Sequence, residues 1–561
     1  MSRSVSARLR RLERLLPIYG SETAPTKRKV LGELAREQMP DAEAVLRLHE
    51  SLLFLRAYPD DAETSALVER LLSRFVRRAD LRAHRDELID SGIVGTPIYY
   101  AFYWATARWL TRRWPDRLSI DWDEFEGIDR LDGLLPLLAS HSEAPAMDAA
   151  DLTTREWIDR LRGPGESDAA CLIRLFERIP ADDFWRERLF ESLETPFTLT
   201  GGPSTPSRTL AHFGDDPIVF QTRPLVRKRP DLHEAIARPT VKVKSLSVAQ
   251  GRQVVDLARE AMVTRSRDLD VFANGDARDV RMVDCGDGLQ FACVGVLPER
   301  RLLLESVYGF LTLKNGVPIG YVLTGTLFNS AEVAYNVFET YRGAEAGYVY
   351  GQVLSMTHQL FGADCFSVDP YQLGHHNAEG LGSGAWWFYY KFGFRAYDAG
   401  VRRVAREELR RMKADPGHRS SRPTLKELVV APVFWHQRKE RADVLGRFPL
   451  GNVGLKITDY LSRRFGGRRK DGEKVCAEEA AGLLGVRSVR SFSPGERVAW
   501  RRWAPLVLIL PGIERWNASD RRELVKVIRA KGGRRESDFV TRFDRHTKLR
   551  RAIVRLGVGR G

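Results

Sequence analysis

A stretch with a two-residue hydrophobic period, in the middle of an otherwise helix-like chain, restricts the fold more than any other feature. Residues 289–296 (LQFACVGV) and the following run RLLLESVYGFLTLKNGVPIGYVLTGTLF have the pattern of strands. Lys314, Asn315 and Gly316 separate two β-rich parts of this run, and an Asn-Gly pair readily takes the positive φ angles of a tight hairpin. The sequence therefore predicts an antiparallel meander.

The segments that flank the meander alternate between strand and helix patterns. VKVKSLS predicts a short strand, QGRQVVDLAREAMV a helix, and AEVAYNVFETY a further strand. The segment GAEAGYVYGQVLSMTHQLFG has helical spacing and ends at Gly362, and the strand CFSVDPY and a helix through GSGAWWFYYKFGF follow it. This order is typical of an α+β fold with a central mixed sheet flanked by helices, and not of a doubly wound one.

The length of 561 residues exceeds what one hydrophobic core supports, so several regions are expected. Apolar residues at helical spacing predict a helical N-terminal region over 1–197, in which IYYAFYWATARWLTRRW forms a buried helix. A linker rich in Gly, Pro, Ser and Thr is expected over 198–239 and the sheet domain over 240–400. Residues 401–561 are expected to form a basic, mainly helical C-terminal region.

The positive charge is concentrated in that C-terminal region. The whole chain has a formal net charge of +15, whereas residues 401–561 hold 40 Lys and Arg against 18 Asp and Glu, a net of +22. Such a region attracts nucleic acid or another anionic partner at long range, and nucleic acid is a possible partner of residues 401–561. The alternative is that the charges only solvate helix faces, since no known nucleic-acid-binding signature accompanies them.

Cysteine usage and hydropathy favour a cytoplasmic protein. The five cysteines form no CxxC pair and are odd in number, which supports neither a disulfide framework nor a zinc ribbon. No membrane span is expected, because the longest uncharged windows are interrupted by proline or polar residues. The Arg-rich start MSRSVSARLRRLERLL predicts an amphipathic helix, with a transit peptide as the alternative.

Two local motifs indicate what chemistry the sheet domain could perform. VFETYRGAEAG joins a predicted strand to a predicted helix, and helix N-termini offer unpaired N–H groups and a positive dipole end to anions. NAEGLGSGAWWFYYKFGFR places a tyrosine four residues before the Gly of a Gly-Phe pair. With the element order, these motifs resemble the GNAT superfamily of acyl-CoA N-acyltransferases over about residues 240–400.

The resemblance implies a site for acetyl-CoA or another acyl-CoA at the first junction. In that family the backbone there holds the pyrophosphate of coenzyme A, which corresponds here to Arg342, Gly343 and Gly347. Glu345 departs from the family pattern, which has Gly at that position, and a carboxylate beside a pyrophosphate is repulsive. Asn377, which precedes the last predicted helix, is the further cofactor-binding candidate.

The resemblance also implies catalytic roles. Tyr389 would protonate the leaving thiolate, with Tyr390 as the alternative if the register differs by one residue. A backbone N–H near Val337 or Phe338 would meet the thioester oxygen.

A carboxylate on the same strand would assist deprotonation of the amine. Glu332 and Glu339 are the candidates for it, and Asp369 is a lesser one. His375 and His376 lie in a nearby loop, but no metal is expected, because no ligand-spaced Asp, Glu or Cys accompanies them.

The sequence thus predicts a GNAT-type acyltransferase that moves an acyl group from acyl-CoA to an unidentified amine. Two alternatives stay open. The acyl donor could be an aminoacyl-tRNA, which suits the basic C-terminal region. The sheet domain could instead be a non-catalytic module in a nucleic-acid-binding protein.

Overall fold

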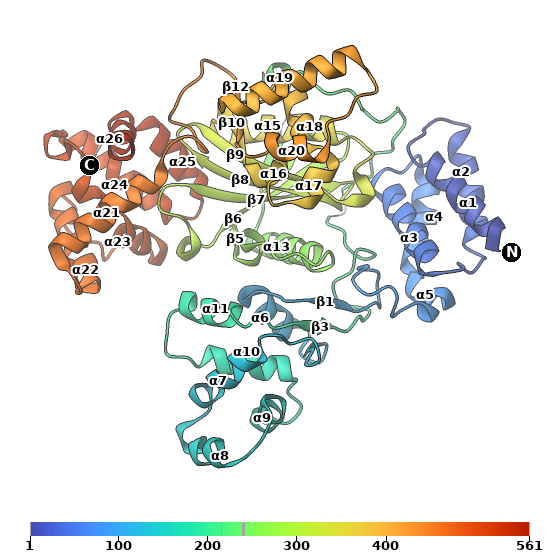
Figure 1. The fold of residues 1–561 in the computed structure, drawn as a ribbon, viewed down its shortest axis with the longest axis horizontal. Coiled ribbons are helices and arrows are strands. Elements are labelled where there is room, and N and C mark those ends of the chain that lie inside the picture. Colours follow the sequence, from blue (N-terminus) through green and yellow to red (C-terminus); the bar gives the residue numbers. More distant parts are fainter. Residues whose placement is uncertain (1, 215, 238–241, 560–561) are drawn as a thin grey trace. The chain divides into compact units, whose positions relative to one another are not determined.

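The computed structural model describes residues 2–214, 216–237 and 242–559 (Figure 1). The chain divides into two compact units that are interleaved in sequence. The first comprises Met1–Leu225, Gln253–Asn274 and Lys314–Pro318, and the second comprises Val226–Arg252, Gly275–Leu313 and Ile319–Gly561. The predicted division at residues 198, 240 and 401 stays a prediction.

The first unit is mainly helical and has two hydrophobic cores. One core is built by residues between Val5 and Ile93, and the other by residues between Ile98 and Leu199 together with Val263. The helices are α1 (Ser2–Leu15), α2 (Thr23–Leu34), α3 (Ala42–Ala57), α4 (Ala62–Ser73), η1 (Phe75–Arg77), α5 (Ala79–Ala83), α6 (Trp104–Arg113), α7 (Ile128–Leu138), η2 (His141–Glu143), α8 (Ala144–Ala149), α9 (Thr154–Leu161), α10 (Asp168–Glu177), α11 (Asp183–Glu191) and α14 (Asp270–Ala273). Helix α13 (Val248–Val263), which the sequence predicted, contributes residues to both units.

A small sheet in this unit corrects the expectation of one long aromatic helix after Ile98. Strand β1 (Ile98–Tyr100) pairs antiparallel with β3 (Phe197–Leu199), which also pairs with β2 (Leu118–Ile120). Only Trp104–Arg113 of the expected helix is helical, as α6. The aromatic and β-branched side chains of Ile98–Tyr100 favour an extended conformation once a partner strand is present.

The second unit contains the predicted mixed sheet, and the α+β class is confirmed. Within the described residues the sheet has nine strands in the order β11-β12-β10-β9-β8-β7-β6-β5-β4. They are β4 (Lys242–Ser245), β5 (Gly275–Asp284), β6 (Leu289–Val296), β7 (Ser306–Lys314), β8 (Val317–Leu327), β9 (Ser330–Val337), β10 (Cys365–Val368), β11 (Arg395–Ala396) and β12 (Val433–His436). The hairpin between β7 and β8 turns at Asn315 and Gly316, which have φ angles of 49° and 75° as the sequence predicted.

The helices of the second unit either follow the sheet strands or form the C-terminal region. They are α12 (Leu232–Ala237), η3 (Pro298–Arg300), η4 (Glu339–Tyr341), α15 (Ala346–Phe361), α16 (Pro370–Leu373), α17 (Ala378–Ser383), α18 (Ala385–Lys391), α19 (Ala399–Ala414), α20 (Arg422–Leu428), α21 (Leu450–Phe465), α22 (Arg469–Leu484), α23 (Pro494–Ile509), η5 (Ile513–Arg515), α24 (Ala518–Lys531), α25 (Glu536–Arg545) and α26 (Thr547–Val558). Strand β12 lies beyond residue 400, yet it fills the sheet between β10 and β11. The sequence predicts one last helix over DFVTRFDRHTKLRRAIVRL, but the structure divides this segment at His546 into α25 and α26.

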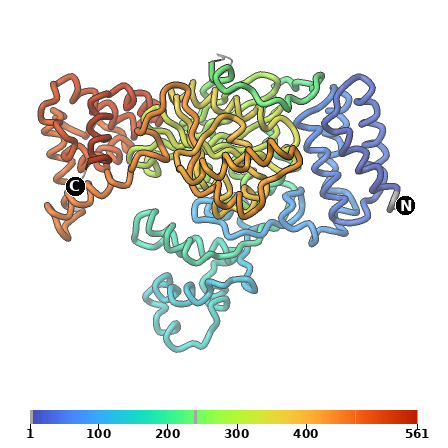
Figure 2. The backbone as a smooth tube through the Cα atoms, turned by 45° about the horizontal axis from the view of Figure 1, so that its top comes forward, coloured from blue at the N-terminus to red at the C-terminus, as the bar shows by residue number. Residues whose placement is uncertain are grey.

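The C-terminal helices lie beside the sheet within this unit (Figures 1 and 2), and a buried polar joint fixes them to it. The Tyr308 hydroxyl on β7 donates to Asp279 Oδ2 on β5 at 2.7 Å and accepts from the Ser537 N–H at 2.7 Å. The Glu536 N–H also donates to Asp279 Oδ2, at 3.1 Å. The first turn of α25 is therefore bonded directly to two strands.

Candidate active site at a fork between two parallel strands

Strands β9 and β10 begin as a parallel pair and then separate. Their pairing joins Ser330 to Cys365, Ala331 to Phe366 and Glu332 to Ser367. Among the described residues, the pairing of β9 with β10 ends at Glu332. Strand β9 itself continues to Val337 and stays paired with β8 over this stretch. The chain crosses from one strand to the other through α15, so the fork opens at the end of β9 where α15 begins.

The backbone of β9 presents N–H groups to this fork. Phe338 donates its N–H to Ile319 O on the β8 side, at 2.9 Å. Successive N–H groups of a strand point to opposite edges, so the N–H of Val337 faces the side that β10 has left. Of the two backbone groups predicted to meet a thioester oxygen, Val337 has the suitable direction and Phe338 does not.

Glu332 is a half-buried carboxyl group at the base of the fork. Burial, and to a smaller extent the nearby carboxylates of Asp369 and Glu305, raise its pKa to about 7. A group with this pKa exchanges a proton readily near neutral pH, which is what a general base requires. Ser367, its partner in the last pair, projects to the same face, and its buried hydroxyl has no hydrogen-bond partner within the described residues.

The other two carboxyl candidates lie in different surroundings. Glu339 is exposed in η4, past the end of β9. Asp369 accepts a hydrogen bond from the Tyr371 N–H at 2.8 Å and caps α16. Of these predicted bases, the structure places Glu332 at the fork and gives it a shifted pKa.

Tyr389 lies on the α15 side of the sheet, in a cluster of tyrosines. Its side chain is 3% exposed, its ring lies 5.4 Å from that of Tyr350 on α15, and burial raises its pKa. Tyr335 on β9 lies 5.4 Å from Tyr350, ring to ring, and burial followed by the charge of Tyr389 raises the pKa of Tyr335. All three hydroxyls therefore stay protonated at neutral pH.

Sequence reasoning did not find Tyr335 and Tyr350 as site residues. The Tyr335 hydroxyl donates to Ala346 O at 3.1 Å, whereas the buried Tyr350 hydroxyl has no partner within the part of the chain that the structure describes. The feature of the sequence that could have identified Tyr335 is the two-residue period of β9, which puts Tyr335 on the face opposite Glu332. Tyr390, the alternative to Tyr389, stacks on Trp386 with ring centres 5.0 Å apart.

The junction before α15 holds the predicted anion-binding residues in a network of contacts. The Arg342 guanidinium is half-exposed, pairs with Glu379 on α17 and donates from Nε to Val337 O at 3.4 Å. A Cβ at Gly347 would lie 3.3 Å from Arg229 Cγ, so Arg229 packs on the first turn of α15. Gly343 lies in open space and has an ordinary negative φ angle.

Glu345 does not point to solvent. Its side chain is 5% exposed and its Oε1 accepts the N–H of Val226 at 2.9 Å. The basic segment that follows Val226 is thereby held beside the start of α15, and Pro230 packs against Gly351 one turn further on. The carboxylate that interrupts the family pattern thus has a structural role in this chain.

Asn377 and the two histidines belong to the loop before α17. Asn377 caps α17, since its Oδ1 accepts the Gly380 N–H at 3.0 Å and its Nδ2 donates to Tyr371 O at 3.1 Å. His375 and His376 contact each other with ring centres 4.2 Å apart. Among the described residues, no group of three or more His, Cys, Asp or Glu side chains is placed to hold a metal ion.

Comparisons with known proteins give no match that bears on this site. No family model matches the sequence, no curated protein matches it, and no solved structure matches the fold. Over the residues that are described, none of the helices combines the length and apolar content that crossing a membrane requires.

Proposed function

We propose that this protein is an acyltransferase of GNAT type, which transfers an acyl group from an acyl-CoA to an amine at the fork between β9 and β10. The observation that carries the proposal is the separation of this parallel pair immediately after Glu332, a carboxyl group whose pKa is raised to about 7. Two further points support the proposal: α15 connects the two separating strands, and the sequence motifs resemble this superfamily.

In this proposal the thioester lies in the fork, between groups on opposite faces of the sheet. The amine nitrogen attacks the carbonyl carbon, Glu332 accepts the proton of the amine, and the Val337 N–H stabilises the developing negative charge on oxygen. The carbon–sulfur bond then breaks, and the Tyr389 hydroxyl protonates the thiolate. Exchange with solvent takes the amine proton from Glu332 and returns one to Tyr389, so both groups regain their starting states. The products are an amide and free coenzyme A.

The residues around the start of α15 suit the anionic part of coenzyme A in two respects. Arg229 packs on the first turn and Arg342 lies just before it, and the N-terminus of a 16-residue helix favours negative charge. The buried Glu345 opposes them electrostatically, although its carboxylate is directed to Val226.

A second candidate donor is an aminoacyl-tRNA. The net charge of +22 over residues 401–561 favours it, as does the ion pair of Arg342 with Glu379, which competes with a pyrophosphate for that guanidinium. The chemistry at the fork would be the same, with an ester oxygen in place of the sulfur as the leaving atom.

The proposal is tested first by binding and then by turnover. Calorimetric titration with acetyl-CoA and with a long-chain acyl-CoA is expected to show saturable binding that Arg342→Gln weakens. A panel of amine acceptors is then assayed for release of coenzyme A with Glu332→Gln and Tyr389→Phe, against the exposed control Glu339→Gln. Absence of binding at millimolar acyl-CoA would reject this donor, and aminoacyl-tRNA would be assayed next.

A further inference from the structure

A pocket of about 820 Å³ lies between α22 and α23, away from the fork in the same unit. Helix α22 ends at Gly485 in the left-handed conformation, and α23 begins with a capping box in which Ser493 and Glu496 bond each other's backbone N–H. The connection between them is therefore short and held at both ends. We call this site the α22–α23 pocket, and it is lined by Glu473, Lys474, Ala477, Glu478, Ala481, Gly482, Val486, Arg487, Ser488, Val489, Arg490, Arg497, Trp500 and Arg501.

The rim of the α22–α23 pocket is strongly cationic. Five Lys and Arg side chains line it against two carboxylates. None of the five has an ion-pair partner within residues 2–214, 216–237 and 242–559, and all five are exposed, although Arg497 donates a hydrogen bond to Phe492 O. Uncompensated charges held around one concavity attract an anion more strongly than the same charges spread over a surface.

The floor of the pocket is apolar. Trp500 is buried, and its Nε1 donates to Ala477 O at 3.1 Å, which fixes the indole against α22. Val486 and Val489, from the connection, are half-buried beside it. A ligand that fits both parts carries negative groups at its edge and a flat or apolar group at its centre.

We propose that the α22–α23 pocket binds nucleotide phosphates, with the base on the apolar floor and the phosphates on the arginine rim. Arginine forks match phosphate oxygens in pairs, and bases pack on apolar and aromatic surfaces without regard to sequence. The ligand is either a single-stranded nucleic acid or a free nucleotide, since both present this chemistry. This site is independent of the acyltransferase proposal.

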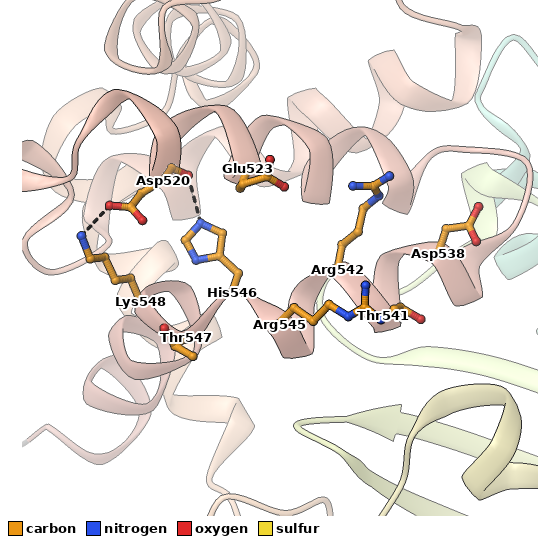
Figure 3. Close-up of a pocket in the computed structure, with 9 residues that line it drawn as sticks. All are labelled: Asp520, Glu523, Asp538, Thr541, Arg542, Arg545, His546, Thr547 and Lys548. Carbon is orange, nitrogen blue, oxygen red and sulfur yellow. Dashed lines mark hydrogen bonds and ion pairs between the residues drawn. The ribbon is translucent and has the colours of Figure 1, made fainter.

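A neighbouring pocket of about 570 Å³ on α24, α25 and α26 provides the internal control (Figure 3). It is lined by as many acidic residues as Lys and Arg residues, so the formal charges of these side chains cancel. Lys548 pairs with Asp520, and Lys526 and then Arg542 lower the pKa of Glu523. Arg542 and Arg545 are exposed like Arg487 and Arg490, so removing either pair changes the net charge equally.

The test compares two double variants of the full chain. Fluorescence anisotropy with a labelled single-stranded RNA homopolymer, and calorimetry with ADP, are carried out on the wild type, Arg487→Gln/Arg490→Gln and Arg542→Gln/Arg545→Gln. Binding is expected to weaken at least about ten-fold in the first variant and less than two-fold in the second. The slope of log affinity against log salt should fall by about 1.4 in the first variant, since each phosphate contact on a single strand contributes about 0.7.

Each result either supports or overturns the proposed nucleotide site. Loss confined to the Arg487/Arg490 variant supports the site, and binding of ADP as well as RNA would identify the free nucleotide as a sufficient ligand. Equal loss in both variants, competition by polyglutamate as strong as by RNA, or no binding of either probe to the wild type would overturn the proposal. Thermal denaturation verifies folding, which is expected to be unchanged because all four arginines are exposed.

Discussion

The Tyr308 hydroxyl donates a 2.7 Å hydrogen bond to Asp279 Oδ2 in the interior of the second unit, and the same hydroxyl accepts the N–H of Ser537. One phenol oxygen thus joins strands β5 and β7 to the first turn of α25. Its burial leaves no water to replace either bond, so the joint contributes more than a surface hydrogen bond does.

Tyr308→Phe is therefore expected to lower the free energy of unfolding by about 2–4 kcal/mol, because it removes both bonds and leaves the buried Ser537 N–H without its acceptor and the Asp279 carboxylate short of one donor. Urea denaturation followed by tryptophan fluorescence measures the change. Tyr371→Phe is the matched control, since Tyr371 is 54% exposed. A loss as small as that of the control would show that the joint does not hold the C-terminal helices.

A buried ion pair beside this joint leads to a second, asymmetric prediction. Lys531 Nζ lies 2.6 Å from Glu536 Oε1, both side chains are at most 3% exposed, and Arg301 Nε lies 3.8 Å from the other carboxylate oxygen. Glu536→Gln removes the carboxylate beside Arg301 and leaves Lys531 with only the weaker attraction of Glu305, whereas Lys531→Met leaves Glu536 with Arg301. The first variant should lose about 3–5 kcal/mol of unfolding free energy and the second should lose less. Equal losses would mean that Arg301 does not compensate the carboxylate.

The elements that the sequence predicted are those that local chemistry determines. Asn315 and Gly316 turn the β7–β8 hairpin and Gly362 ends α15 in the left-handed conformation, as expected, and the Ser-Pro-Gly-Glu sequence at Ser493 predicts the capping box that begins α23. Each of these depends on the conformational preference or side-chain bonding of a few consecutive residues. Patterns of this kind can be recognised without knowing the partners of the element.

The parts that were missed depend on distant partners. Strand β12 is a four-residue apolar run within a basic, helix-rich region, and it is extended because β10 and β11 pair with it on both sides. The break at His546 arises where its Nδ1 accepts the Leu549 N–H and starts a new helix. At the site, Glu332 could be named from a resemblance, but Tyr350 and Ser367 gain their significance from burial without a partner, which only the packed structure reveals.

The five cysteines are buried and unpaired, and burial raises the pKa of each thiol, to about 11 for Cys171 and about 12 for Cys293. Only the thiolate reacts with disulfide reagents, so both access and ionisation protect these residues. We expect less than one thiol per native chain to react with Ellman's reagent at pH 8, and five to react in guanidinium chloride. Rapid reaction of a thiol in the native protein would identify a region that opens readily.

Glu345 offers a test of the anion site at the start of α15. Glu345→Gln keeps an oxygen that can accept the Val226 N–H but removes a negative charge next to the helix N-terminus. If coenzyme A phosphates bind there, the affinity for acetyl-CoA should rise by about 0.5–1.5 kcal/mol in calorimetry. Glu339→Gln removes an exposed charge from the same junction and should have a smaller effect. Unchanged or weaker binding in Glu345→Gln would place the phosphates elsewhere.

The raised pKa of Glu332 predicts opposite effects of pH on activity and on stability. If Glu332 is the base of the proposed acyl transfer, its carboxyl must be ionised, so the rate should rise with pH and reach half its maximum near pH 7, the value to which its pKa is raised. Glu332→Gln should abolish this rise, whereas Glu339→Gln should retain it.

The effect on stability has the reverse sign. Because the folded pKa of Glu332 exceeds its ordinary value of 4.5, the folded state binds the extra proton, and its contribution to stability is lost as the pH rises through about 7. Glutamine carries no charge at any pH, so Glu332→Gln should gain stability relative to the wild type between pH 5 and pH 8. Thermal denaturation at the two pH values measures this gain without any substrate. If the difference in stability between Glu332→Gln and the wild type were the same at pH 5 and pH 8, Glu332 would be ionised over this whole range. Its proposed role as a base with a pKa near neutrality would then have to be abandoned.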